Sequence, residues 1–252
     1  ACLERQGLHD RAMDKFEEAH DMYRSLYGED HEDVAMVLGN MAVVLKRQGK
    51  HAEALAMEEK VLGIRRRTLG SEHEHVALSL LSLGGSYRQQ GMLEEALARL
   101  EEGLGIQRRI HPERHSHEGM FLVSIGNVNR DQGKLEDALA MYKKALRIYE
   151  RTVGPESADV GRALYHMANV LHKQGKHDKA IKKYEKALTI LRGALGEEHD
   201  EVAQTLYSMA VCKERAGDAE GAAVCVREAH RIFSKRGISH GTAQKAAAIV
   251  AR

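Results

Sequence analysis

The sequence repeats with a period of 42 residues, which is clearest in a column of glycines. The glycines of this column are Gly7, Gly49, Gly91, Gly133, Gly175 and Gly217. Alanine stands five residues after each of them, at Ala12, Ala54, Ala96, Ala138, Ala180 and Ala222. A third column is aliphatic and holds Met22, Ile64, Ile106, Ile148, Ile190 and Ile232. Three columns that match six times without an insertion indicate a tandem repeat.

Within a repeat the apolar residues have helical spacing. One stripe stands at i, i+3, i+4 and i+7, as in Leu38, Met41, Ala42 and Leu45, and a second stripe follows the glycine. Each repeat is therefore predicted to form a first helix (the A helix), a tight turn with a left-handed glycine, and a second helix (the B helix). The small alanine lets the two helices approach closely. A helix pair cannot bury both stripes alone, so the repeats are predicted to stack into an all-α solenoid.

The connections between repeats have their own pattern. Glycine ends the B helix in four of them, and acidic residues or serine follow and favour the start of the next helix; the glycines are Gly28, Gly70, Gly154 and Gly196. Histidine recurs at one position of the connections, as His31, His73, His115 and His199. Because this column shares the 42-residue period, we expect a structural role for it.

Composition excludes several classes of protein. The formal net charge is +1, so the chain has no bulk attraction for nucleic acid or for membranes. No apolar run approaches the roughly 18 residues of a spanning helix, and no signal-peptide pattern opens the chain. The cysteines Cys2, Cys212 and Cys225 form no CxxC pair, which favours a reducing, cytoplasmic setting. We expect Cys212 and Cys225 to be small core residues.

The repeat resembles a known family. Helix A through helix B is similar to the tetratricopeptide repeat at Leu80, Leu83, Gly84, Tyr87, Gly91 and Ala96. The 42-residue period and the LG-x-x-H-x-x-VA connector resemble the kinesin-light-chain type. The resemblance implies a right-handed α-solenoid, a cytoplasmic and cytoskeleton-associated protein, and a concave face of A helices that holds a peptide or a helix of another protein. Three residues depart from the family's aromatic position in the B helix, namely Glu58, Leu100 and Val226.

The register divides the chain into one solenoid over residues 1–252. A partial first repeat covers 1–28, full repeats cover 29–70, 71–112, 113–154, 155–196 and 197–237, and a capping segment covers 238–252. The first repeat lacks most of its A helix. We therefore expect a preceding segment or a partner chain to cover its face, as in a larger complex.

The stripe of the A helices opposite to the packed one is the predicted peptide-binding groove. Its residues are Met36, Lys46, Leu78, Leu81, Arg88, Met120, Asn127, Arg130, Arg162, Tyr165, Asn169, His172 and Tyr207. Four of them, Lys46, Arg88, Arg130 and His172, share one column and would form a basic row. Together with the amides and the apolar side chains, this row suits an extended acidic-apolar segment. The alternative is an ordinary solvated face.

A carboxylate clamp like that of co-chaperone relatives is not expected, because Val123 and Tyr165 stand where such a clamp has lysine. No catalytic motif or cofactor-binding loop is present, so an enzyme is not expected and no cofactor is predicted. A cluster of His111, His115 and His117 with Glu113 and Glu118 has metal-ligand chemistry. Such clusters in loops more often bind nothing, so no metal site is predicted.

Arg65, Arg66 and Arg67 end a B helix, where cations complement the helix dipole. Taken together, these patterns predict a scaffold or adaptor that binds a partner protein, and neither nucleic acid nor a membrane. The alternative is a structural subunit of a large assembly that uses its convex face and open ends.

Overall fold

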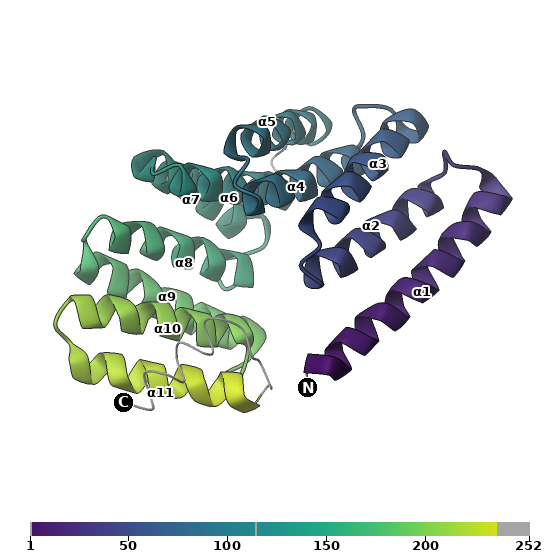
Figure 1. Ribbon diagram of the computed structural model, residues 1–252. Coiled ribbons are helices and arrows are strands. Elements are labelled where there is room, and N and C mark those ends of the chain that lie inside the picture. Colours follow the sequence, from purple (N-terminus) through teal and green to yellow (C-terminus); the bar gives the residue numbers. More distant parts are fainter. Residues whose placement is uncertain (1, 114, 236–252) are drawn as a thin grey trace. The chain divides into compact units, whose positions relative to one another are not determined.

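Eleven helices and no strand make up the part of the chain that the computed structural model describes, residues 2–113 and 115–235. The helices are α1 (Cys2–Tyr27), α2 (Glu32–Arg47), α3 (His51–Leu69), α4 (Glu74–Gln89), α5 (Leu93–Ile110), α6 (Ser116–Asp131), α7 (Leu135–Thr152), α8 (Ala158–Lys173), α9 (His177–Leu195), α10 (Asp200–Arg215) and α11 (Ala219–Lys235) (Figure 1). The predicted all-α class is confirmed. Within the described ranges, no helix has both the length and the apolar character needed to cross a membrane.

Each full repeat contains one helix pair. The pairs are α2 with α3, α4 with α5, α6 with α7, α8 with α9, and α10 with α11. Helices pack together in the pairs α2–α3, α4–α5, α8–α9 and α10–α11, and within each unit a B helix packs on the next A helix, as α9 does on α10. This is the stacking that the apolar stripes predict.

The turn inside each full repeat is the predicted glycine turn. Its glycine has a φ angle between +73° and +88° at Gly49, Gly91, Gly133, Gly175 and Gly217. The residue after the glycine donates its N–H to the carbonyl five positions earlier, as Lys176 does to Leu171 at 2.9 Å. This bond closes the end of the A helix.

The first repeat differs from the prediction. Helix α1 runs through Gly7, so no turn forms at this member of the glycine column. A glycine inside a helix costs only about 0.5–1 kcal/mol, and here no packed A helix favours a reversal of the chain. Met22 is correspondingly 62% exposed, although the aliphatic column is buried in the full repeats.

The histidines of the connections cap the N-termini of the helices that follow them. The Nδ1 atom of His31, His73, His115 and His199 accepts a hydrogen bond from the backbone N–H two residues later, at 3.1–3.3 Å. These histidines precede the first residues of α2, α4, α6 and α10. The structural role is therefore an N-cap, which satisfies one backbone donor at each helix start.

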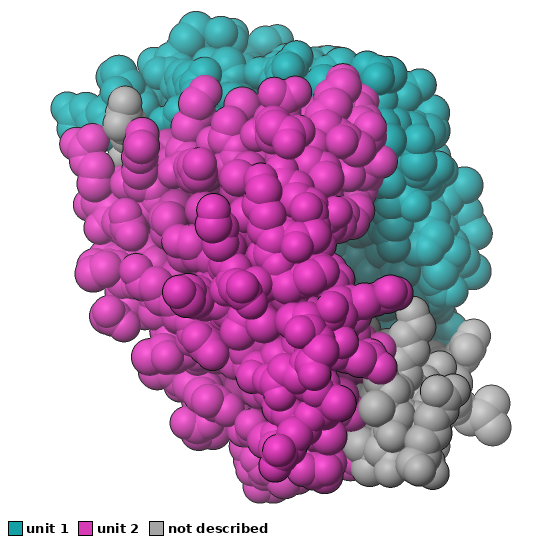
Figure 2. All heavy atoms as spheres, turned by 90° about the vertical axis from the view of Figure 1, so that its left-hand side faces the viewer, with its two compact units in different colours: residues 1–128 teal, residues 129–252 magenta. Residues whose placement is uncertain are grey.

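The helices form two compact units, residues 1–128 and 129–252, which Figure 2 shows in two colours. In unit 1, α1 packs on a core of α2 and α3 that includes Val34, Leu38 and Ile64. In unit 2, one continuous core runs through α8 to α11 and includes Tyr184, Cys212 and Cys225, as expected of these two cysteines. The predicted capping segment 238–252 lies outside the described residues.

Candidate peptide-binding surface

The predicted groove residues of unit 1 include exposed apolar side chains. Met36 is 45% exposed and Met120 is 40% exposed, and Val43 on the same stripe of α2 is 44% exposed. Leu78 and Leu81 on α4 are half-buried. Methionine adapts its shape to a partner, so these positions can supply apolar anchors for a bound segment.

Lys46 is bound to the B helix of its own repeat. Its Nζ atom lies 2.6 Å from Oε1 of Glu58, which also accepts a hydrogen bond of 2.5 Å from the Ser82 hydroxyl. Glu58 is only 6% exposed and stands at the position where the family has an aromatic residue. The charge of Lys46 therefore neutralises a buried carboxylate, which reduces the charge it can offer a ligand.

Arg88, Asn127 and Arg130 are half-buried. Arg88 and Asn127 each interact with other groups of the chain. Arg130 lies against Asp131, with its Nη2 atom 2.9 Å from Oδ1. The basic column is thus partly compensated by local carboxylates, which the 42-residue spacing alone does not reveal.

In unit 2 the groove residues of α8 and α10 border a hollow of about 240 Å³. Its walls include Arg162, Tyr165, Leu191 and Gln204. Arg162 donates two hydrogen bonds to Glu201, at 2.8 and 2.9 Å, and a third to Asp159 at 2.8 Å. These carboxylates raise the pKa of Arg162, first through the hydrogen bonds that Arg162 donates to Glu201. The ion pair therefore stiffens one wall of the hollow.

Tyr165, Asn169 and Tyr207 are further predicted groove residues of unit 2. The Tyr184 hydroxyl donates to Oδ1 of Asn169 at 2.6 Å, and the N–H₂ group of this amide can donate to a peptide carbonyl. Tyr165 is half-buried, and its hydroxyl lies 3.4 Å from that of Ser208. Burial, followed by Glu214, raises the pKa of Tyr207, which therefore stays neutral and can donate a hydrogen bond.

His172, the last member of the basic column, does not favour a positive charge. Burial lowers its pKa first, and the neighbouring His177 and Arg215 lower it further. At neutral pH the ring is therefore mostly uncharged.

A lysine-rich hollow of about 560 Å³ lies on the face of α8 opposite to Tyr165 and Asn169. It was not predicted from the sequence. Its floor is apolar, formed by Leu139, Met167 and Leu171. Its rim holds Lys143, Lys176, Lys179, Lys182, Lys183 and Lys186. A signal existed in the sequence, since four of these lysines stand at i, i+3, i+4 and i+7 along α9.

The histidine cluster of the fourth connection gathers a different acid from those predicted. Ligand atoms of His115, His117 and Glu74 lie within 4.8 Å of one another, and His117 Nδ1 is 2.9 Å from Oε1 of Glu74. Glu118 is bound instead to Arg108, at 2.8 Å. The Arg65, Arg66 and Arg67 side chains are likewise held, by Glu32, Glu102 and Asp30.

Comparison with known proteins agrees with the fold of stacked helix pairs. A family model described as tetratricopeptide repeat matches residues 1–67, 59–109, 119–192 and 159–235. A search of curated proteins finds no match.

Solved structures share the fold at low identity. The crystal structure of BtubC (BKLC) from P. vanneervenii has a TM-score of 0.75 at 20% identity, covering 92% of this chain and 93% of that one. The Podosopora anserina putative kinesin light chain with nearly identical TPR-like repeats has a TM-score of 0.64 at 20% identity, covering 83% and 100%. The apo form of RapI has a TM-score of 0.72 at 16% identity, covering 92% and 79%.

Proposed function

Because the chain belongs to the tetratricopeptide repeat family, we propose that it is an interaction scaffold whose A helices bind an extended acidic-apolar segment of a partner protein. The observation that carries the proposal is the apolar exposure of the A-helix stripe, at Met36 and Met120 above all. Methionine side chains on one stripe expose apolar surface to water, and a bound partner segment would bury that surface. The hollow beside Tyr165 adds a place for one partner side chain.

Apolar anchors carry most of the affinity in this proposal. Lys46 and Arg130 lie against carboxylates of the chain, so the basic column contributes through steering and orientation. An exposed charge pair contributes only about 0–1 kcal/mol. The proposal assigns no catalytic step to the chain. It includes a reducing cytoplasmic setting, which suits the buried free thiols of Cys212 and Cys225.

The test is a fluorescence-anisotropy titration with a library of extended acidic-apolar peptides. The double change Met36→Glu with Met120→Glu replaces two anchors by charges that repel acidic side chains. We expect it to weaken the best peptide by about tenfold or more, which corresponds to about 1.4 kcal/mol. The matched control is Met22→Glu on α1, where the methionine is 62% exposed but lies outside the stripe. Equal binding by all three proteins would overturn the groove proposal.

A second candidate function is a subunit of a larger assembly that docks through its B helices, and the lysine-rich hollow favours it. Five of its lysines, Lys143, Lys179, Lys182, Lys183 and Lys186, lie on the B helices α7 and α9. Met167 and Leu171 lie on the face of α8 opposite to Tyr165 and Asn169, so the two surfaces are separable by mutation. An acidic amphipathic helix of a partner has the complementary charge and apolar face.

The same titration separates the two candidates. Lys182→Glu with Lys186→Glu reverses two charges at the rim of the lysine-rich hollow. If the partner segment binds the A helices, this variant retains the wild-type affinity. If the segment binds the B helices, the affinity of this variant for the peptide falls by about tenfold or more, and the affinity of the methionine variant does not change.

A further inference from the structure

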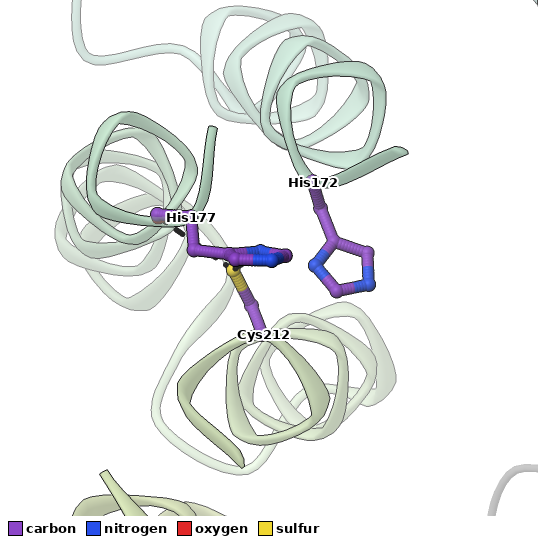
Figure 3. A group of neighbouring side chains, drawn as sticks. All are labelled: His172, His177 and Cys212. Atoms are coloured by element: carbon purple, nitrogen blue, oxygen red, sulfur yellow. Dashed lines mark hydrogen bonds between the residues drawn. The ribbon is translucent and has the colours of Figure 1, made fainter. Parts of the chain in front are cut away.

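Three metal-ligating side chains meet where the repeats 155–196 and 197–237 stack. His172 is in the last turn of α8, His177 is the first residue of α9, and Cys212 is on α10. Figure 3 shows the two imidazole rings and the sulfur turned toward one another from three helices. One ligand atom from each residue lies within 4.8 Å of the others. The Cys212 Sγ and His177 Nδ1 atoms are 3.8 Å apart.

The fold explains why these residues meet. The turn at Gly175, with a φ angle of +73°, reverses the chain between the two histidines and brings their ring centroids to 5.1 Å. Helix α10 then packs on both α8 and α9, which places Cys212 against the turn. The packed ends of α8 and α9 thus position the two histidines, and the packed helix α10 positions Cys212.

The distances suit zinc. Bonds of about 2.3 Å to sulfur and about 2.0–2.1 Å to nitrogen place ligand atoms of a tetrahedral site roughly 3.3–3.6 Å apart. The Cys212 to His177 distance is already close to this value. His172 is half-buried at a helix end, so rotation of its side chain can close the remaining distance.

The side chains are incompletely satisfied without a metal. The Nδ1 atom of His172 is buried and has no hydrogen-bond partner among the described residues. The Cys212 thiol is fully buried and makes two long contacts to His177, at 3.6 Å to its carbonyl oxygen and 3.8 Å to its Nδ1 atom.

We propose that His172, His177 and Cys212 bind one zinc ion, which ties the turn of one repeat to the A helix of the next. Two imidazoles and a thiolate are the ligand types that zinc prefers. Binding releases the thiol proton to solvent, and a water molecule takes the fourth position. The test of this proposal uses no peptide, so its outcome is independent of the outcome for the proposed function.

The test uses the full chain carrying Cys2→Ser, stripped of metal by a chelator, with Co²⁺ as the spectroscopic probe. One equivalent of Co²⁺ should produce the visible bands of a tetrahedral site together with a thiolate-to-cobalt charge-transfer band, and Zn²⁺ should remove both. Saturating Zn²⁺ should also raise the melting temperature, since it binds the folded chain.

Matched variants assign the ligands. Cys212→Ala should abolish the charge-transfer band, while Cys225→Ala, which removes another buried thiol of the same core, should retain it. His172→Gln should weaken zinc binding by roughly 100-fold or more, given that even indirect partners of ligands cost 10–100-fold. His166→Gln, on the same helix, should bind zinc as the parent does. Because His172 is half-buried, its variant should fold and give the same circular dichroism spectrum.

Three results would overturn the proposal. The first is the absence of cobalt binding. The second is binding without a charge-transfer band, which would assign the metal to histidines elsewhere, such as those beside Glu74. The third is a zinc-dependent rise in melting temperature that is the same in His172→Gln as in the parent.

Discussion

At the scale of single residues, two adjacent glycines of α4 face different surroundings. A Cβ atom added at Gly84 would lie 2.5 Å from Cγ of Leu100, whereas one added at Gly85 would meet nothing within 4 Å. The column of Gly84 holds alanine in three other repeats, at Ala42, Ala168 and Ala210. The repeat pattern alone would therefore favour alanine here, but the packing of Leu100 excludes it.

This difference gives a prediction with a built-in control. Gly85→Ala should stabilise the protein by about 0.5–1 kcal/mol through helix propensity. Gly84→Ala gains the same stability from helix propensity, but its methyl group must displace the fully buried Leu100, which costs about 1–3 kcal/mol. We expect the second variant to be the less stable of the two by that cost, as measured by urea unfolding. Equal stabilities would mean that Leu100 moves aside freely.

A histidine N-cap has a measurable effect at the same scale. His199→Ala removes the acceptor for the Glu201 N–H, at 3.2 Å in the structure, and should cost about 0.5–1 kcal/mol. His199→Asn keeps a capping acceptor and should cost less. Thermal unfolding followed by circular dichroism measures both. If asparagine and alanine are equally destabilising, the ring contributes by packing and not by capping.

At the scale of helices, ion pairs recur with the period of the repeat. A cation near the end of the B helix pairs with an acid that precedes the A helix of the same repeat, in Arg67–Asp30, Arg109–Glu72 and Lys235–Glu198. The hydrogen bond from the cation lowers the pKa of each acid. Solvent screens these exposed pairs, so they orient the connections and contribute little to stability.

The Lys46–Glu58 pair is different, because its carboxylate is buried between helices. Lys46→Met leaves Glu58 uncompensated, and breaking a buried pair costs about 3–5 kcal/mol. Lys46 is partly exposed, so we expect a loss of about 2–3 kcal/mol. Glu58→Leu introduces the residue that Leu100 supplies at this position in the next repeat.

The double variant Lys46→Met with Glu58→Leu should therefore recover most of the loss. A double-mutant cycle of unfolding free energies measures this coupling. Strictly additive losses would show that the two side chains do not depend on each other.

At the scale of the whole molecule, stability should vary along the chain, since a repeat contacts mainly its neighbours. Helix α9 packs on α8 and on α10, whereas α1 packs mainly on α2. Leu26 and Tyr27 of α1 are also 64% and 51% exposed. Opening of α1 should therefore require less free energy than opening of α9.

Hydrogen exchange followed by mass spectrometry tests this gradient. The amides of α1 should exchange roughly tenfold faster or more than those of α9 under native conditions. Uniform protection from α1 to α11 would contradict a nearest-neighbour array. It would indicate a single cooperative unit instead.

The sequence by itself determined the helices and their turns. Apolar spacing, the glycine column and the alanine column act within a few residues of each other, so the helix pairs and the left-handed turns follow from local rules. The face that carries Met36 and Met120 follows in the same way from helical periodicity.

Only the tertiary structure decided which side chains meet between helices. Glu58 meets Ser82 across 24 residues of sequence, and Cys212 meets His177 across 35. Leu100 excludes a side chain at Gly84, and α1 continues through Gly7 where the repeat predicted a turn. These outcomes depend on the packing of neighbouring helices. A repeating pattern assigns every repeat the same neighbours, whereas the particular side chains of each repeat decide which contacts form.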